Sequence, residues 1–103
     1  MPMITISDSD RDLMGIDTRL DIYVELGCLG CRRAVELAAW VRERFPAVKV
    51  QVMEPHEDDS DQARLVRATP TYFLNGAQFS LGNPSTDELE SALLAVERDG
   101  DRP

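Results

Sequence analysis

Apolar and polar residues alternate along two stretches of the chain, 20–26 and 48–53, and this period of two predicts β-strands. Between them, apolar residues recur at the three- and four-residue spacing of a helix, at Ala34, Leu37, Ala38, Val41 and Phe45. A helix from Cys31 to Phe45, stopped by Pro46, is therefore expected. The three elements together predict a right-handed βαβ unit with parallel strands.

The second half of the chain predicts a hairpin followed by a helix. Short apolar runs at 71–74 and 78–81 flank Asn75-Gly76, a dipeptide typical of tight hairpin turns. The run Ser85-Thr86-Asp87-Glu88 has the form of a capping box, which marks the start of a helix. The buried stripe of this last helix is predicted to consist of Leu89, Ala92, Leu93 and Val96.

The segment between these halves is polar and acidic. Residues 54–61 are predicted to form a loop, and residues 62–68 a short helix capped by Asp59 or Ser60. The predicted fold class is α/β, with the order β-α-β-α-β-β-α and a four-stranded mixed sheet flanked by three helices.

One domain accounts for a chain of this length. It is expected to cover residues 19–98, between an N-terminal extension at 1–18 and a frayed tail at 99–103. The extension contains a short apolar run, which forms either an additional edge strand or part of a disordered segment. Both alternatives stay open from the sequence alone.

Charge and apolar content exclude several kinds of partner. The chain has 19 acidic residues against 11 lysines and arginines, and its net charge of −8 disfavours nucleic acid and anionic membranes. No stretch reaches the ~20 apolar residues that a membrane helix needs, and the acidic N-terminus is unlike a secretory signal. We therefore expect a cytoplasmic monomer without a cofactor, and an exported protein that has lost its signal is the alternative.

The candidate chemistry lies where the first predicted strand gives way to a helix. Cys28 and Cys31 are separated there by two residues. The amide groups and dipole of a helix N-terminus lower the pKa of a nearby thiol, so Cys28 is predicted to be the attacking thiolate and Cys31 the resolving thiol. Arg32 and Arg33 are expected to tune the thiolate if they turn toward it, and Glu25 to oppose them if its side chain shares that face.

The same cysteine spacing also occurs in metal sites and in ordinary cores. A closed zinc site needs four ligands, and His56 and the acidic residues are the other candidates in the chain, so no metal site is expected. Two buried cysteines that act merely as small apolar residues fit poorly at a junction between strand and helix. A non-catalytic module that holds a soft metal ion or a partner protein through the pair is the alternative function.

A proline directly before a strand is the second signal. Pro70 precedes the strand 71–74, at a position where its missing N–H need not join a β-ladder. With this residue included, the chain resembles the thioredoxin superfamily from Leu20 to Val96. The resemblance rests on the order strand, C-x-x-C, helix, on the interval from Cys31 to Pro70, on the T-P-T-Y-F-L-N-G hairpin and on Gly82 before the last helix.

The resemblance implies a thioredoxin-like fold and a thiol–disulfide oxidoreductase. It implies that the Thr69–Pro70 peptide bond is cis and lies beside the cysteine pair; an ordinary trans proline is the alternative from the sequence alone. Thr69 is then expected to offer main-chain groups to an extended substrate, in a binding set with Pro70, Leu29 and Gly30. The expected partners are a protein disulfide substrate and a reductase or small-thiol electron donor.

The chain also departs from typical members of that superfamily. Gly27 replaces the tryptophan before the first cysteine, Gly30 replaces the proline between the cysteines, and Ile22 stands where thioredoxins have a buried aspartate. Leu29 follows the first cysteine, where glutaredoxins usually have tyrosine. The predicted protein is therefore a minimal, divergent member with a C-L-G-C motif, whose redox potential depends on these residues.

Overall fold

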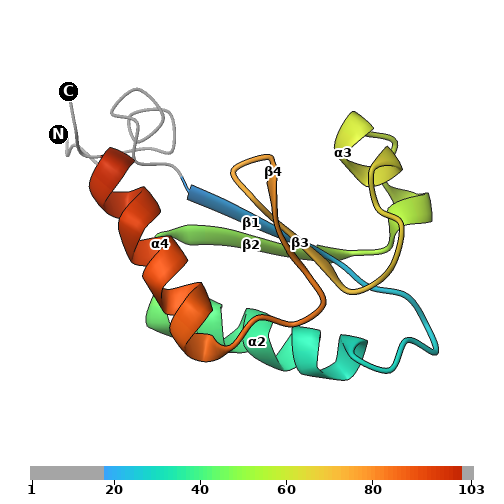
Figure 1. Cartoon of the computed structure of the whole chain (residues 1–103), viewed down its shortest axis with the longest axis horizontal. Coiled ribbons are helices and arrows are strands. Elements are labelled where there is room, and N and C mark those ends of the chain that lie inside the picture. Colours follow the sequence, from blue (N-terminus) through green and yellow to red (C-terminus); the bar gives the residue numbers. More distant parts are fainter. Residues whose placement is uncertain (1–17, 101–103) are drawn as a thin grey trace, which may run out of the picture.

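A four-stranded mixed sheet organises the structure, a computed structural model that describes residues 18–100 (Figure 1). The strand order is β2-β1-β3-β4, and the central strand β1 pairs parallel with β2 and antiparallel with β3. The strands are β1 (Thr18–Tyr23), β2 (Val48–Met53), β3 (Thr71–Leu74) and β4 (Ala77–Leu81). This topology confirms the predicted α/β class and the mixed sheet.

Two long helices, α2 (Cys31–Arg44) and α4 (Thr86–Gly100), cover one face of the sheet (Figure 1). The four-residue helix α3 (Asp61–Arg64) lies on the opposite side, after the 3₁₀ turn η1 (Pro55–Glu57). The predicted capping box is present at the start of α4: the N–H of Ser85 donates to the Glu88 carboxylate, and the N–H of Glu88 donates to Ser85 Oγ.

The main core lies between the sheet and the two long helices. Its buried members are Leu20, Ile22, Ala34, Leu37, Ala38, Val41, Phe45, Val48, Tyr72, Leu89 and Leu93. The predicted stripe of α2 is thus entirely buried, and burying each large side chain contributes about 2 kcal/mol. This packing fixes α2 on the sheet, so the N-terminus of α2, where the cysteines lie, has a defined position.

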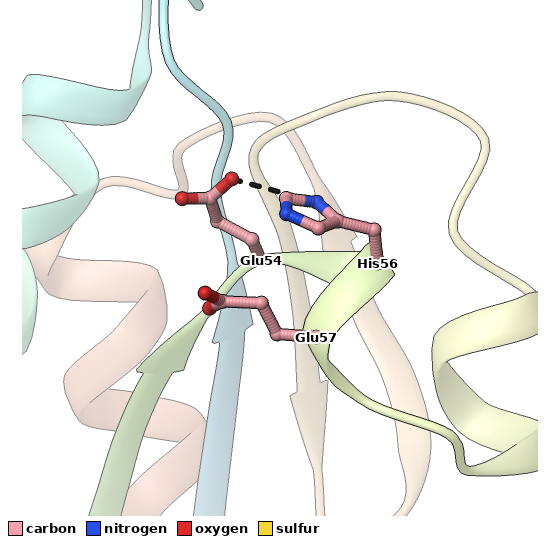
Figure 2. A group of neighbouring side chains, drawn as sticks. All are labelled: Glu54, His56 and Glu57. Atoms are coloured by element: carbon pink, nitrogen blue, oxygen red, sulfur yellow. Dashed lines mark ion pairs between the residues drawn. The ribbon is translucent and has the colours of Figure 1, made fainter.

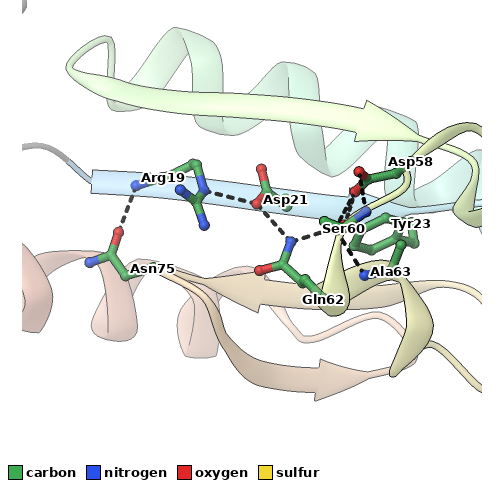
Figure 3. Close-up of polar contacts among 8 residues, drawn as sticks. All are labelled: Arg19, Asp21, Tyr23, Asp58, Ser60, Gln62, Ala63 and Asn75. Carbon is green, nitrogen blue, oxygen red and sulfur yellow. Dashed lines mark hydrogen bonds and ion pairs between the residues drawn. The ribbon is translucent and has the colours of Figure 1, made fainter.

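A smaller core of Tyr23, Ala63 and Phe73 lies on the other face of the sheet. A polar network that includes Tyr23 lies beside it (Figure 3). The rings of Tyr23 and Phe73 pack edge to face, with 5.6 Å between their centroids. The Tyr23 hydroxyl donates to Asp58 Oδ2 (2.6 Å), and Gln62 Nε2 donates to Asp21 Oδ2 (2.9 Å). These bonds attach α3 and the loop before it to β1.

Two predicted elements are shorter than expected. The first strand ends at Tyr23 rather than at residue 26, because the chain turns at Leu26 and at Gly27, whose φ is +80°. The helix predicted at 62–68 ends at Arg64, since the chain then turns so that Val66 packs against the smaller core. The predicted short helix is therefore present, but its predicted end at residue 68 was wrong. Ser60, one of the two expected caps, accepts the N–H of Ala63 at its start.

The expected N-terminal extension, apart from Thr18 in β1, lies outside the described residues, as do residues 101–103 of the expected tail. The question of an extra edge strand therefore falls on residues that the structure does not describe. Within residues 18–100, no helix is both long and apolar enough to cross a membrane.

Candidate functional site

The two cysteines are joined in a disulfide at the N-terminus of α2. Their Cα atoms are 5.4 Å apart. Cys31 is the first residue of the helix and is only 7% exposed, whereas Cys28 lies in the preceding turn and is half-buried. Cys28 is therefore the sulfur that a partner reaches more easily.

The positive end of the α2 helix dipole lies at this pair, and no side-chain cap or acidic residue in the first turn offsets it. Gly30 is the N-cap, and because it has no side chain it makes no capping hydrogen bond. The first turn also contains no acidic residue. Free amide N–H groups at a helix start favour a nearby anion, so this position suits a thiolate.

A main-chain donor faces the inner cysteine. The N–H of Glu25 donates to Cys31 Sγ at 3.5 Å. The Glu25 carboxylate, which was expected to oppose the thiolate, accepts a hydrogen bond from the Thr69 hydroxyl at 3.2 Å. Glu25 thus connects the segment after β1 with the loop that contains Thr69, and its N–H was not identifiable from the sequence because a main-chain group has no residue signature.

The loop before β3 packs directly against the cysteine turn. The Thr69–Pro70 peptide bond is cis, and Pro70 is buried. The Pro70 carbonyl accepts from the N–H of Gly82 (2.8 Å), which ties this loop to the end of the hairpin. Among the hydrogen bonds of residues 18–100, none uses the main-chain N–H or carbonyl of Thr69, and this residue is half-buried.

Three other predicted site residues, Leu29, Arg32 and Arg33, are exposed, and so is Leu26, which was not predicted. Leu29 is 102% exposed, and Leu26, two positions before Cys28, is 93% exposed. Arg33 pairs with Glu36 at 3.3 Å. In the part of the chain that the structure describes, neither arginine makes a hydrogen bond or an ion pair with the cysteines.

A further site residue was missed by the sequence-based prediction. Asn83, in the loop between β4 and α4, donates from Nδ2 to the carbonyl oxygen of Gly30 at 2.9 Å. Its Oδ1 accepts from the hydroxyl of Tyr72 at 2.7 Å. A lone asparagine after a strand is common in loops, and only the folded arrangement brings it to the cysteine turn.

Three potential metal ligands meet at the start of η1, away from the cysteine turn in sequence (Figure 2). Glu54, His56 and Glu57 bring two carboxylates and an imidazole within 4.8 Å of one another, and His56 Nδ1 lies 3.5 Å from Glu54 Oε1. Both His56 and Glu57 are exposed, and the contact between Glu54 and His56 is an ordinary surface ion pair when the imidazole is protonated. We assign no metal to this group.

A polar hollow of about 400 Å³ lies on the face of the sheet that carries α3. It is lined by Arg19, Asp21, Gln51, Met53, Asp58, Ser60 and Gln62, so none of the predicted site residues belongs to it. Arg19 pairs with Asp21 there, while Asp21 Oδ1 is buried without a hydrogen-bond partner. The candidate redox site is therefore a surface at the start of α2 rather than this hollow.

Comparison with solved structures identifies the fold. The chain is similar to thioredoxin O2 from Arabidopsis thaliana in its oxidised state, with a TM-score of 0.56 and 14% sequence identity, over 88% of this chain and 90% of that one. No protein-family model and no curated protein matches the sequence. The likeness confirms a thioredoxin-like fold.

Proposed function

We propose that this chain, a thioredoxin-like domain with two cysteines at the start of α2, is a thiol–disulfide oxidoreductase. The observation that supports it best is the Cys28–Cys31 disulfide at an uncapped helix N-terminus, packed beside the loop of Thr69 and Pro70. This arrangement combines a reactive sulfur, a favourable electrostatic environment and main-chain groups suited to a partner.

The first step is attack on the disulfide by a thiolate of a partner dithiol. It attacks Cys28 Sγ, the more accessible sulfur, and a new bond forms between the partner and Cys28. The bond between Cys28 and Cys31 breaks, and its electron pair leaves on Cys31. The N–H of Glu25, which already faces Cys31 Sγ, stabilises the departing thiolate until it takes a proton from water.

The second step resolves the mixed disulfide. The partner's second thiol loses its proton to water, and its thiolate attacks the partner sulfur that is bonded to Cys28. That bond breaks, Cys28 leaves as a thiolate, and the partner is released as a disulfide after giving two electrons to the pair. The reverse direction uses the same bonds: Cys28 attacks a protein disulfide, Cys31 resolves it, and a reductase or small thiol regenerates the dithiol.

The proposed docking surface consists of Leu26, Leu29 and Thr69, and the buried Pro70 fixes the Thr69 main chain beside it. The N–H and carbonyl of Thr69 are suited to pair with an extended segment of the partner, as a strand edge does. The two leucines expose apolar surface next to Cys28, and covering it contributes about 25 cal/mol per Å². An extended partner segment with an apolar residue beside its cysteine therefore fits best.

Reduction of insulin by a dithiol, followed by turbidity, tests the proposal. The wild-type chain is expected to accelerate it, and Cys28→Ser and Cys31→Ser to abolish the acceleration. Cys31→Ser should also trap a mixed disulfide through Cys28, visible by mass spectrometry. If the wild type is no faster than both serine variants and forms no reversible disulfide, the proposal is wrong; a titration with Cu(I) under reducing conditions then tests the binding-module alternative.

A further inference from the structure

Asn83 connects two parts of the molecule through both ends of its side-chain amide. Nδ2 donates to the Gly30 carbonyl at 2.9 Å, and Oδ1 accepts from the Tyr72 hydroxyl at 2.7 Å. Gly30 is the N-cap of α2 and lies between the two cysteines, whereas Tyr72 is fully buried in β3. A single amide thus ties the cysteine turn to the interior of the sheet.

The two partners allow one orientation of this amide. A carbonyl oxygen can only accept, so Gly30 requires the NH₂ group of Asn83. If the amide were turned over, its own oxygen would face the Gly30 carbonyl and that bond would be lost. Burial raises the pKa of Tyr72, so its hydroxyl keeps its proton and remains a donor at neutral pH. The buried Tyr72 hydroxyl therefore fixes the orientation of the Asn83 amide.

Pro70 packs against the cysteine turn, but the turn has few other hydrogen bonds to the rest of the molecule. Within the residues that the structure describes, the remaining main-chain hydrogen bonds of this turn stay inside the turn and its helix. They run from Cys28 N–H to the Glu25 carbonyl, from Cys31 N–H to the Cys28 carbonyl, and from Ala34 N–H to the Gly30 carbonyl. The disulfide adds a covalent constraint, and reduction removes it.

We propose that Asn83 is a positioning residue of the redox pair, which holds the start of α2 in the dithiol state and so favours the reduced form. This inference rests on the proposed thiol–disulfide function. In the oxidised chain the disulfide already restricts Gly30, so the bond from Asn83 adds little order. In the reduced chain that bond replaces the lost constraint and keeps the Cys28 sulfur near the first-turn amides, which stabilise a thiolate.

The direct test is equilibration of Asn83→Ala with a glutathione redox buffer. We expect its equilibrium to shift toward the disulfide by about two- to tenfold relative to the wild type, the range for one hydrogen bond. The pKa of the Cys28 thiol should rise at the same time. Tyr72→Phe keeps the buried ring but releases the other end of Asn83, so a smaller shift in the same direction is expected, and this variant serves if Asn83→Ala folds poorly.

Ser85→Ala is the matched control from the same loop. Ser85 Oγ accepts the N–H of Glu88 at the start of α4, so its loss weakens that helix without touching Gly30. Its redox equilibrium is expected to equal that of the wild type. If the redox equilibrium of Asn83→Ala shifts no further than that of Ser85→Ala, the role of Asn83 is overturned, because general destabilisation would then explain the shift.

The same measurement separates this inference from the proposed function. A wild-type chain that forms no reversible disulfide in the glutathione buffer overturns the proposed function. The role of Asn83 is then decided by the Cys28 pKa, taken from the pH dependence of the alkylation rate. A higher pKa in Asn83→Ala than in the wild type supports the role, and an equal pKa excludes it.

Discussion

The ring of Pro70 lies against Gly30. A Cβ atom on Gly30 would come within 3.3 Å of Pro70 Cδ and 3.1 Å of Asn83 Nδ2. The φ and ψ of Gly30, −93° and −3°, are within reach of other residues, so space rather than backbone conformation favours glycine here. The cysteine turn and the proline loop therefore form one packed unit, and a side chain between them would push them apart.

Gly30→Ala should consequently destabilise the oxidised chain by about 1 kcal/mol, since the crowding outweighs the small gain from a less flexible unfolded state. The midpoint of urea unfolding measures this change. Leu29→Ala, at the adjacent exposed position, is the control and should leave the midpoint unchanged. A Gly30→Ala midpoint equal to the wild type would mean that Pro70 and Asn83 move aside without cost.

In the reduced chain, Cys28 should react with iodoacetamide roughly ten times faster than Cys31 at neutral pH, because thiolate character and access control alkylation. Cys28 is half-buried, whereas Cys31 is 7% exposed and lies inside the first turn of α2. Peptide mapping after brief alkylation measures the ratio. Equal labelling of both residues would contradict the assignment of Cys28 as the attacking thiol.

Acid should weaken the attachment of α3 to the sheet. Hydrogen bonds from Tyr23 and Ser60 lower the pKa of Asp58. A carboxyl whose folded pKa is depressed adds stability above its unfolded pKa, and this contribution is lost as the pH falls through the folded value. The stability advantage of the wild type over Tyr23→Phe should therefore shrink below about pH 4, measured by urea unfolding at several pH values.

Asp59→Asn is the control for that series, because Asp59 is a neighbouring exposed carboxylate that makes only a loose ion pair with Arg64 at 3.7 Å. Because this pair is exposed, its removal should change the free energy of unfolding only slightly at every pH of the series. If the free energy of unfolding of Tyr23→Phe differs from that of the wild type by the same amount at pH 3 as at pH 7, the Tyr23–Asp58 bond does not contribute to the pH dependence of stability.

Leu29→Ser should raise the KM for a protein disulfide about threefold or more while leaving the rate with a small disulfide such as oxidised glutathione unchanged. The reason is that a small disulfide does not cover the exposed leucine, whereas a protein segment buries its apolar surface. Leu94→Ser, at an exposed position of α4, is the matched control and should change neither rate. An equal loss of activity with both substrates would mean that the substitution changes the reactivity of Cys28 rather than the docking of the partner.

The sequence by itself determined most of the elements and the location of the cysteine pair. The periodic stripe that ends at Val41 and Phe45 and the capping box that begins at Ser85 depend on neighbours within one or two turns, so these parts of the prediction agree with the structure. Cys28 and Cys31 are three positions apart, and that interval alone brings them to a single turn.

Only the tertiary structure brought Asn83 into the site, whereas the place of Pro70 beside the cysteine pair was expected from the family resemblance and not from any local pattern. The bond from Asn83 to Gly30 joins positions 53 residues apart, and the contact of Pro70 with Gly30 likewise depends on how β3 lies beside β1. The early end of α3 follows from Val66 turning to the smaller core. Such contacts form when the sheet and helices pack, and no local pattern of apolar and polar residues specifies them.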